Sequence, residues 1–250
     1  MIIETDIGRD PDDLLALTCL CEAKENIEAL VISPGDRDQV AVAHMMRELY
    51  GLKFKIGVCE SVINKVDRGS SNPFHERILK YYGFPATKEP DGTGPEIIQE
   101  VATPDSRFFI CGPAKNTYNY LLKYEPKWPN NMFMLMQGGF CPYSIYRPGV
   151  TLEKFEGKHK VPSFNPNGCP KFIPFALRFF NATSFVGKNV CHTIEYDRTN
   201  RVSFVSRRLD AMFHRHLDRA KKLHDVVAAL CFVWPELGVW HKGIPIRDKG

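Results

Sequence analysis

The first fourteen residues gather carboxylates at a spacing that could hold a metal ion. Four aspartates fall within eight positions, directly after the apolar pair Ile2–Ile3, and they are Asp6, Asp10, Asp12 and Asp13. Carboxylates this close repel one another, and a hard divalent cation with oxygen ligands relieves the repulsion. The pattern therefore predicts a cation site at the start of the chain.

A purely structural explanation covers three of the four acids. Asp10 could cap a helix whose first residue is Pro11, and Asp12 and Asp13 would then lie in its first turn, near the positive end of the helix dipole. Asp6 is not explained in this way, because it precedes the helix and ends an apolar strand. Both explanations can hold together, since a capped helix keeps metal ligands in place.

The rest of the chain alternates strand-like and helix-like segments, which predicts an α/β fold: a doubly wound, mostly parallel sheet with helices on both faces. Ligands of such sheets bind at the carboxyl ends of the strands. We expect long loops at 60–105, with one helix at 75–82, and at 141–169. The expected strands are 2–3, 27–33, 54–58, 108–110, 132–136 and 183–186, and the expected helices are 14–23, 40–49, 115–124, 174–180, 206–223 and 226–233.

The composition fits one globular domain spanning residues 1–250. The net charge of +4 does not by itself indicate a nucleic-acid or membrane partner, and the apolar runs are too short to span a bilayer. Eight cysteines are spread along the chain without a Cys-x-x-Cys pair. We expect no signal peptide before Met1. We therefore expect free thiols in a reducing cytoplasm rather than disulfides or a zinc site.

Further motifs follow the acidic segment in a fixed order. They are Pro34-Gly35-Asp36, Gly92-Thr93-Gly94, Cys111-Gly112-Pro113 with Asn116, Gly138-Gly139, Phe164-Asn165 and His224-Asp225. Taken together with Thr5-Asp6-Ile7-Gly8-Arg9-Asp10-Pro11-Asp12-Asp13, this order resembles the inosine-uridine nucleoside hydrolase superfamily over about residues 2–235, in the branch with an Asp-Pro-Asp-Asp signature.

The resemblance implies Ca²⁺-dependent hydrolysis of the N-glycosidic bond of a ribonucleoside. Calcium suits an oxygen-rich ligand set, and it can bind a ribose diol and a water together, while positive charge grows on the sugar in the transition state. The roles that it implies are these: metal ligands Asp6, Asp13, Asp225 and the carbonyl of Cys111; proton acceptor Asp6 or Asp10; leaving-base donor His224; substrate contacts Asp36, Asn165 and Phe164.

Several of these residues also have structural explanations. The His224-Asp225 pair could simply cap a helix, Gly-Gly and Gly-Pro pairs are common turns, and Phe164 could be a core aromatic residue. The inserted Pro11 leaves the alignment of Asp10 and Asp12 open by one position. Where the family commonly has a glutamate that holds the sugar 5′-hydroxyl, this chain has Ser163. That departure predicts a substrate altered at the base or at the 5′ position.

Two other functions remain open at this point. A Mg²⁺-dependent phosphohydrolase would use an acidic pair such as Glu4 and Asp6 at the end of the first strand. A nucleoside-binding protein without activity could keep the same fold, although retention of every acid speaks against it. By the resemblance we expect a small-molecule nucleoside as the partner and a homo-oligomer as the assembly.

Overall fold

The computed structural model describes residues 1–7, 11–63, 73–86, 88–127, 131–141, 152–196 and 221–243. Their main element is a seven-stranded sheet in the order β4-β3-β2-β1-β5-β6-β7, and every neighbouring pair in it is parallel. The strands are β1 Ile2–Thr5, β2 Ala29–Ile32, β3 Lys55–Val58, β4 Gly92–Thr93, β5 Arg107–Ile110, β6 Phe133–Gln137 and β7 Ala182–Val186.

Helices follow most strands, as the predicted doubly wound fold requires, and this prediction is confirmed. The helices are α1 Asp12–Glu22, α2 Arg37–Leu49, α3 Glu60–Ile63, α4 Pro73–Tyr81, α5 Gly94–Val101, α6 Lys115–Tyr124, α7 Phe164–Gly168, α8 Phe172–Ala176, α9 Lys188–Cys191 and α11 His224–Val233. Two short 3-10 turns are η2 Glu153–Phe155 and η3 Pro235–Leu237, and a small antiparallel pair is formed by β8 Glu195–Tyr196 and β9 Lys221–Lys222.

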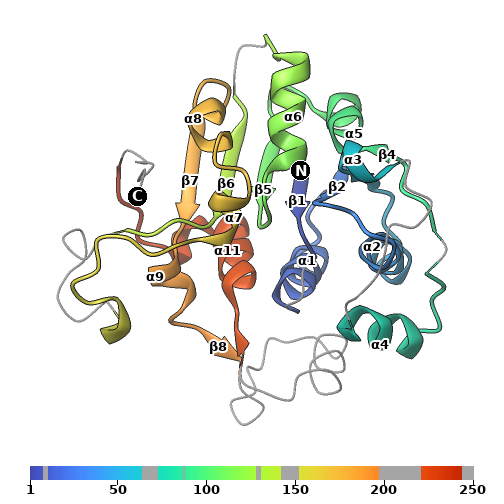
Figure 1. The fold of residues 1–250 in the computed structure, drawn as a ribbon, viewed down its shortest axis with the longest axis horizontal. Helices are drawn as coiled ribbons and strands as arrows, with labels where there is room; N and C mark the ends of the chain where they lie inside the picture. Colours follow the sequence, from blue (N-terminus) through green and yellow to red (C-terminus); the bar gives the residue numbers. More distant parts are fainter. Residues whose placement is uncertain are drawn as a thin grey trace.

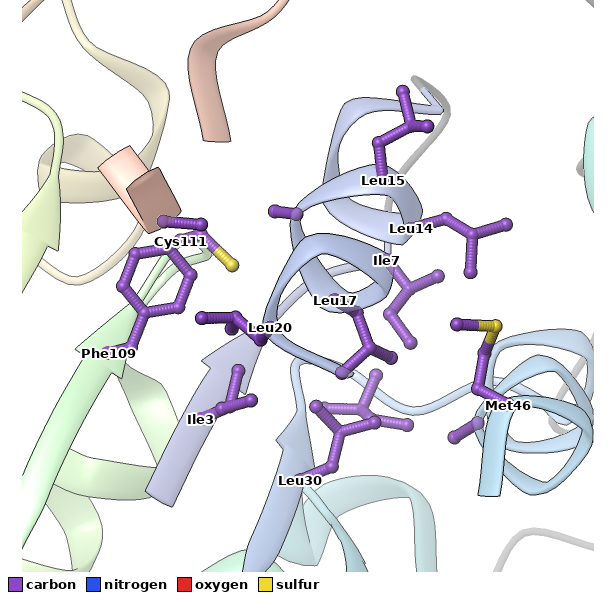
Figure 2. Packing of buried hydrophobic residues seen from close by; sticks show 14 of the residues in the cluster. Ile3, Ile7, Leu14, Leu15, Leu17, Leu20, Leu30, Met46, Phe109 and Cys111 are labelled. Atoms are coloured by element: carbon purple, nitrogen blue, oxygen red, sulfur yellow. The ribbon is translucent and has the colours of Figure 1, made fainter. Parts of the chain in front are cut away.

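The sheet separates two hydrophobic clusters, because successive side chains of a strand point to opposite faces. Ile3 of β1 belongs to the cluster beneath α1, α2, α4 and α11, whereas Ile2 belongs to the one beneath α5, α6 and α8. Figure 1 shows these two groups of helices on opposite sides of the strands. Figure 2 shows the first cluster, with Leu17 and Leu20 of α1 packed above Ile3 and Leu30.

The structure departs from the sequence prediction mainly in the segment 60–105. Besides α4, this segment contains β4 and the helix α5, where a loop was expected. Gly94 and Pro95 signal a break in a sequence, but here Pro95 occupies the first turn of α5, where a proline fits, and Ile97 and Ile98 are buried. The expected helix 206–223 lies almost wholly outside the described residues.

The chemistry of the thiols agrees with the sequence analysis. All eight cysteines are free, and five of them are buried: Cys21, Cys59, Cys111, Cys191 and Cys231. None of the helices in the described ranges is long and apolar enough to cross a membrane.

Candidate metal centre and its surroundings

The candidate site lies where the strand order reverses. From β1 the chain builds β2, β3 and β4 on one side and later β5, β6 and β7 on the other, so β1 and β5 meet at the switch point of the sheet. The first residues after these two strands are Asp6 and Cys111. The two strand ends approach closely, because a Cβ on Gly112, the residue after Cys111, would come within 2.5 Å of the backbone nitrogen of Asp6. Crevices at such switch points are the usual ligand sites of open α/β sheets.

Three buried carboxylates converge above this point. Asp12 and Asp13 lie in the first turn of α1 and Asp225 lies in the first turn of α11, two helices that pack on each other. Their ligand oxygens lie within 4.8 Å of one another. Burial raises the pKa of Asp225 well above its ordinary value, and Asp13, Asp12 and Asp6 raise it further, in that order. Protons or a cation must balance these charges.

Thr5 and Ile7 hold the amino-terminal part of this arrangement. The Thr5 hydroxyl donates a 2.5 Å hydrogen bond to Oδ1 of Asp13 and accepts one of 3.0 Å from the backbone N–H of Ile7. Ile7 has a φ of 28°, which is strained for a β-branched residue. Its side chain is buried in the cluster of Figure 2, so packing holds the strained turn next to Asp6.

The carbonyl of Cys111, the residue after β5, is held by a side chain of α7. It accepts a 2.8 Å hydrogen bond from Nδ2 of Asn165, which also lies within hydrogen-bond distance of the carbonyl and the side-chain oxygen of Gln137. A carbonyl has two acceptor positions, so Cys111 can accept this bond and still bind a cation. Burial raises the pKa of the Cys111 thiol, and the charges of Asp13, Asp225 and Asp6 raise it further.

His224 connects the acids to a second imidazole. Its Nδ1 lies 3.8 Å from Oδ2 of Asp12. The ring of His192, which follows α9, lies 4.5 Å from that of His224 between centroids, at an interplanar angle of 40°. Burial lowers the pKa of His192 to about 4, with His224 and Lys154 as the next contributions. His192 is therefore neutral near pH 7.

The remaining predicted residues differ in their contacts with this centre. Asp36 caps α2, and its partner Gln39 also donates from its side chain to the backbone carbonyl of Asp6, so Asp36 is one residue removed from the acids. Phe164 is 70% exposed, so its interpretation as a core aromatic residue is wrong. Asp10 lies outside the described residues.

Glu4 lies apart from the centre, although it stands next to Thr5 in sequence. Its carboxylate accepts hydrogen bonds from the backbone N–H groups of Asn116 and Thr117, both 2.8 Å, and from the Ser33 hydroxyl at 2.9 Å. It thus caps α6 on the opposite face of the sheet. An acidic pair of Glu4 and Asp6, as a phosphohydrolase would need, does not form in this arrangement.

Comparison with known proteins addresses the fold. No family model matches the sequence. An uncharacterized protein of Aquifex aeolicus strain VF5 is 28% identical over 156 residues, which cover 56% of this chain and 51% of that protein, so the match spans about half of the relative's length.

Solved structures match over almost the whole chain. A plant nucleoside hydrolase, at 17% identity and a TM-score of 0.63, covers 94% of this chain and 79% of its own. The inosine-uridine preferring nucleoside hydrolase of Bacillus anthracis is 14% identical with a TM-score of 0.64, and the match covers 94% of this chain and 82% of that protein. A purine-preferring ribonucleoside hydrolase of Gardnerella vaginalis is 17% identical with a TM-score of 0.58, and the match covers 94% of this chain and 80% of that protein.

The chain has the nucleoside hydrolase fold.

Within the nucleoside hydrolase fold, three residues around the acids carried no signal in the sequence, and the role of a fourth, Asp12, was left open. The alignment of Asp12 with the family signature was uncertain because of Pro11, yet Asp12 belongs to the cluster of three carboxylates with Asp13 and Asp225. Thr5 and Gln137 are ordinary strand residues in sequence, and their roles follow from bonds to distant partners. His192 carries no local motif, and its stacking on His224 depends on the packing of α9 against α11.

Proposed function

We propose that this chain hydrolyses the N-glycosidic bond of a ribonucleoside and uses a calcium ion held by its acidic centre. The observation that carries the proposal is the convergence of Asp12, Asp13 and Asp225 within 4.8 Å, at the switch point of a nucleoside hydrolase fold. The donors are carboxylate and carbonyl oxygens, and such donors suit calcium or magnesium rather than zinc or copper.

The residues that would hold the ion are Asp13 and Asp225, with Asp12, Asp6 and the carbonyl of Cys111 around them. The test of fit is electrostatic: the pKa of buried Asp225 is raised by burial and by three other acids, so a cation stabilises the folded centre. When bound, the ion supplies Lewis acidity toward a water and toward ribose oxygens.

The chain's own groups account for the other requirements of the reaction. Asp6 is half-buried beside the acids, where it can accept the proton of an attacking water. Asn165 turns its amide nitrogen toward Cys111 and Gln137, so its amide oxygen is the atom available to a ribose hydroxyl. Asp36 would accept from a second hydroxyl, and exposed Phe164 would cover the sugar.

We propose His224 as the group that assists departure of the base. The base leaves with its bonding electrons and needs a proton or a hydrogen-bond donor, while the ribose takes on oxocarbenium character. His224 lies against Asp12 and is backed by the neutral ring of His192.

We propose further that residues 1–250 act as one domain and that the protein is cytoplasmic and forms homo-oligomers.

The experiment is hydrolysis of a nucleoside panel by the purified protein, together with calorimetric titration of Ca²⁺ into protein stripped with a chelator. We expect base release that requires Ca²⁺, and loss of both binding and activity in Asp13→Asn. The matched control is Asp105→Asn, an acid on the surface that is bonded to Asn131. Absence of calcium binding at millimolar concentration, or activity that survives complete chelation, would refute the metal-dependent proposal.

A further inference from the structure

A group of lysines surrounds the histidine pair at the edge of the acidic centre. Lys154 of η2 contacts Nδ1 of His192 at 2.7 Å and lies 5.1 Å from the centre of the Phe155 ring. An ammonium group has no lone pair, so Lys154 is the donor and His192 the acceptor. Although Lys154 is exposed, these two contacts hold its charge in a fixed place.

Lys188 approaches the same place from α9. The backbone N–H of His192 donates to the carbonyl of Lys188, so the two residues share one helical turn. The Lys188 side chain is half-buried and has no hydrogen bond or ion pair to any of the described residues. Burial lowers its pKa, and the charge of Lys154 lowers it further. Residues four apart lie on the same face of a helix, so Lys188 lies on the side of α9 that carries the His192 ring and its contact with Lys154.

Glu195 of β8 forms a salt bridge with Lys222 of the neighbouring strand β9. Burial lowers the pKa of Lys154 and Lys222 lowers it further, whereas Glu195 raises it and Lys158 again lowers it. Among the described residues, lysines therefore outnumber acids around Lys154. The acidic centre and this group of lysines are therefore two separate, oppositely charged regions on either side of His224.

The backbone of Lys188 connects this positive region to the predicted sugar end of the site. Its N–H donates to the carbonyl of Gly139 at 3.0 Å, and the N–H of Gly139 donates to the hydroxyl of Ser163 at 3.1 Å. Lys188 thus lies between Ser163 and the histidine pair. A nucleoside carries its base and its 5′ carbon on the same face of the ribose, so a group on either could reach this position.

We propose that Lys154 and Lys188 form a subsite for an anionic oxygen group, a phosphate or a carboxylate, carried by the nucleoside substrate. The inference rests on the proposed function, and it narrows the substrate class to nucleosides with a negative charge on the 5′ carbon or on the base. An anion between the two ammonium groups removes their mutual repulsion and forms charge-assisted hydrogen bonds with both. His192 serves this subsite by holding Lys154 in position.

The test uses calorimetry in the presence of Ca²⁺ to measure the binding of two matched pairs of probes to the purified protein. One pair is ribose and ribose 5-phosphate, and the other is uracil and 5-carboxyuracil. In at least one pair we expect the charged probe to bind roughly tenfold to a hundredfold more tightly than its neutral twin, the range for hydrogen bonds to charged groups. The pair that shows the preference identifies whether the phosphate or the base carries the charge.

Variants decide whether the two lysines are responsible. The doubly substituted Lys154→Met, Lys188→Met protein should lose the preference, and the Lys154→Arg, Lys188→Arg protein should keep most of it. The control Lys171→Met removes an exposed charge at the start of α8 and should change nothing. The preference should also weaken with added salt.

Equal binding of charged and neutral twins in both pairs, or a preference that survives the double methionine variant, would overturn the inference. Because binding is measured without turnover, failure of the proposed function is a different result. It would appear as absence of base release from every nucleoside tested, whether or not the charged probes are preferred.

Discussion

Buried carboxylates on the two faces of strand β1 are compensated in opposite ways. Glu4 faces α6 and receives hydrogen bonds from two backbone N–H groups and one hydroxyl. On the other face, Thr5 donates to Asp13, which adjoins Asp12 and Asp225. Burial raises the pKa of both Glu4 and Asp225, but hydrogen bonds oppose the shift at Glu4, whereas neighbouring acids add to it at Asp225.

The difference separates a structural acid from the acids proposed as metal ligands. The Glu4 carboxylate is stabilised by donors at a helix N-terminus, so it can remain charged inside the protein without any further partner. The three aspartates also lie at helix N-termini, but their carboxylate oxygens lie within 4.8 Å of one another. The direction of the pKa shift is the same for Glu4 and Asp225, and only the surrounding atoms distinguish the two carboxylates.

The largest expected effect is that of Asp225→Asn. With Ca²⁺ present we expect hydrolysis to fall by at least about a thousandfold, equivalent to about 4 kcal/mol of transition-state stabilisation. In chelator the variant should unfold at a higher temperature than the wild type, because one of the repelling charges is gone. Steady-state kinetics and thermal unfolding with and without Ca²⁺ measure both effects. A variant that is less stable than the wild type in chelator would contradict the account of repelling acids.

A second prediction concerns His75 of α4, a buried histidine whose ring makes no hydrogen bond among the described residues. It is 1% exposed, and neither ring nitrogen has a hydrogen-bond partner among the described residues. Burial lowers its pKa from 6.5 to about 4. The unfolded chain takes up a proton below pH 6.5, whereas the folded protein does so only near pH 4. The contribution to stability is therefore complete above pH 6.5, and about 3 kcal/mol is lost as the pH falls to 4.

Urea unfolding at pH 7.5, 6 and 4.5 tests this, with His75→Leu compared to the wild type at each pH. The comparison isolates His75, because all other titrating groups, the aspartates included, are common to both proteins. We expect the stability of the variant relative to the wild type to increase toward acid pH. The control His241→Leu removes an exposed histidine and should leave a constant difference. A pH-independent difference for His75→Leu would contradict the prediction.

A third prediction tests the structural acid of the opening comparison. Glu4→Gln places an amide NH₂ against the N–H donors of Asn116 and Thr117, and we expect a loss of about 2 kcal/mol in the free energy of unfolding. The stabilisation by Ca²⁺ should be unchanged. The matched control is Glu60→Gln, whose exposed ion pair with Lys123 contributes little. Loss of the calcium response in Glu4→Gln would place Glu4 in the metal centre and remove the contrast between the two faces.

Sequence reasoning reached the fold and the types of residue at the centre, but not their local geometry. The parallel sheet follows from alternating strand and helix patterns, which are local signals. Asp13 and Asp225 were connected through the family resemblance, and the structure brings them together with Asp12; their roles as ligands stay predictions. The different hydrogen-bond partners of Glu4 and Asp13 could not be predicted, because they depend on which residues distant in sequence contact each carboxylate after folding.

The fourth and smallest effect concerns Asp36, which combines the two kinds of carboxylate. Its side chain accepts a 2.9 Å hydrogen bond from the N–H of Gln39 and so caps α2, yet it is also the predicted contact for a ribose hydroxyl. Asp36→Ala should lower the free energy of unfolding by about 1 kcal/mol through loss of the cap. Asp36→Ser keeps a capping hydroxyl and should leave stability nearly unchanged.

The serine variant therefore separates the two roles of Asp36. If the carboxylate also binds substrate, Asp36→Ser raises KM although the protein remains as stable as the wild type, because a capping hydroxyl cannot replace a charged acceptor at the ribose. If Asp36 is only a cap, like Glu4 on the other face, kinetics and stability both stay at wild-type values in Asp36→Ser, while Asp36→Ala loses stability alone. Urea unfolding and steady-state kinetics on the same preparations decide between these two results.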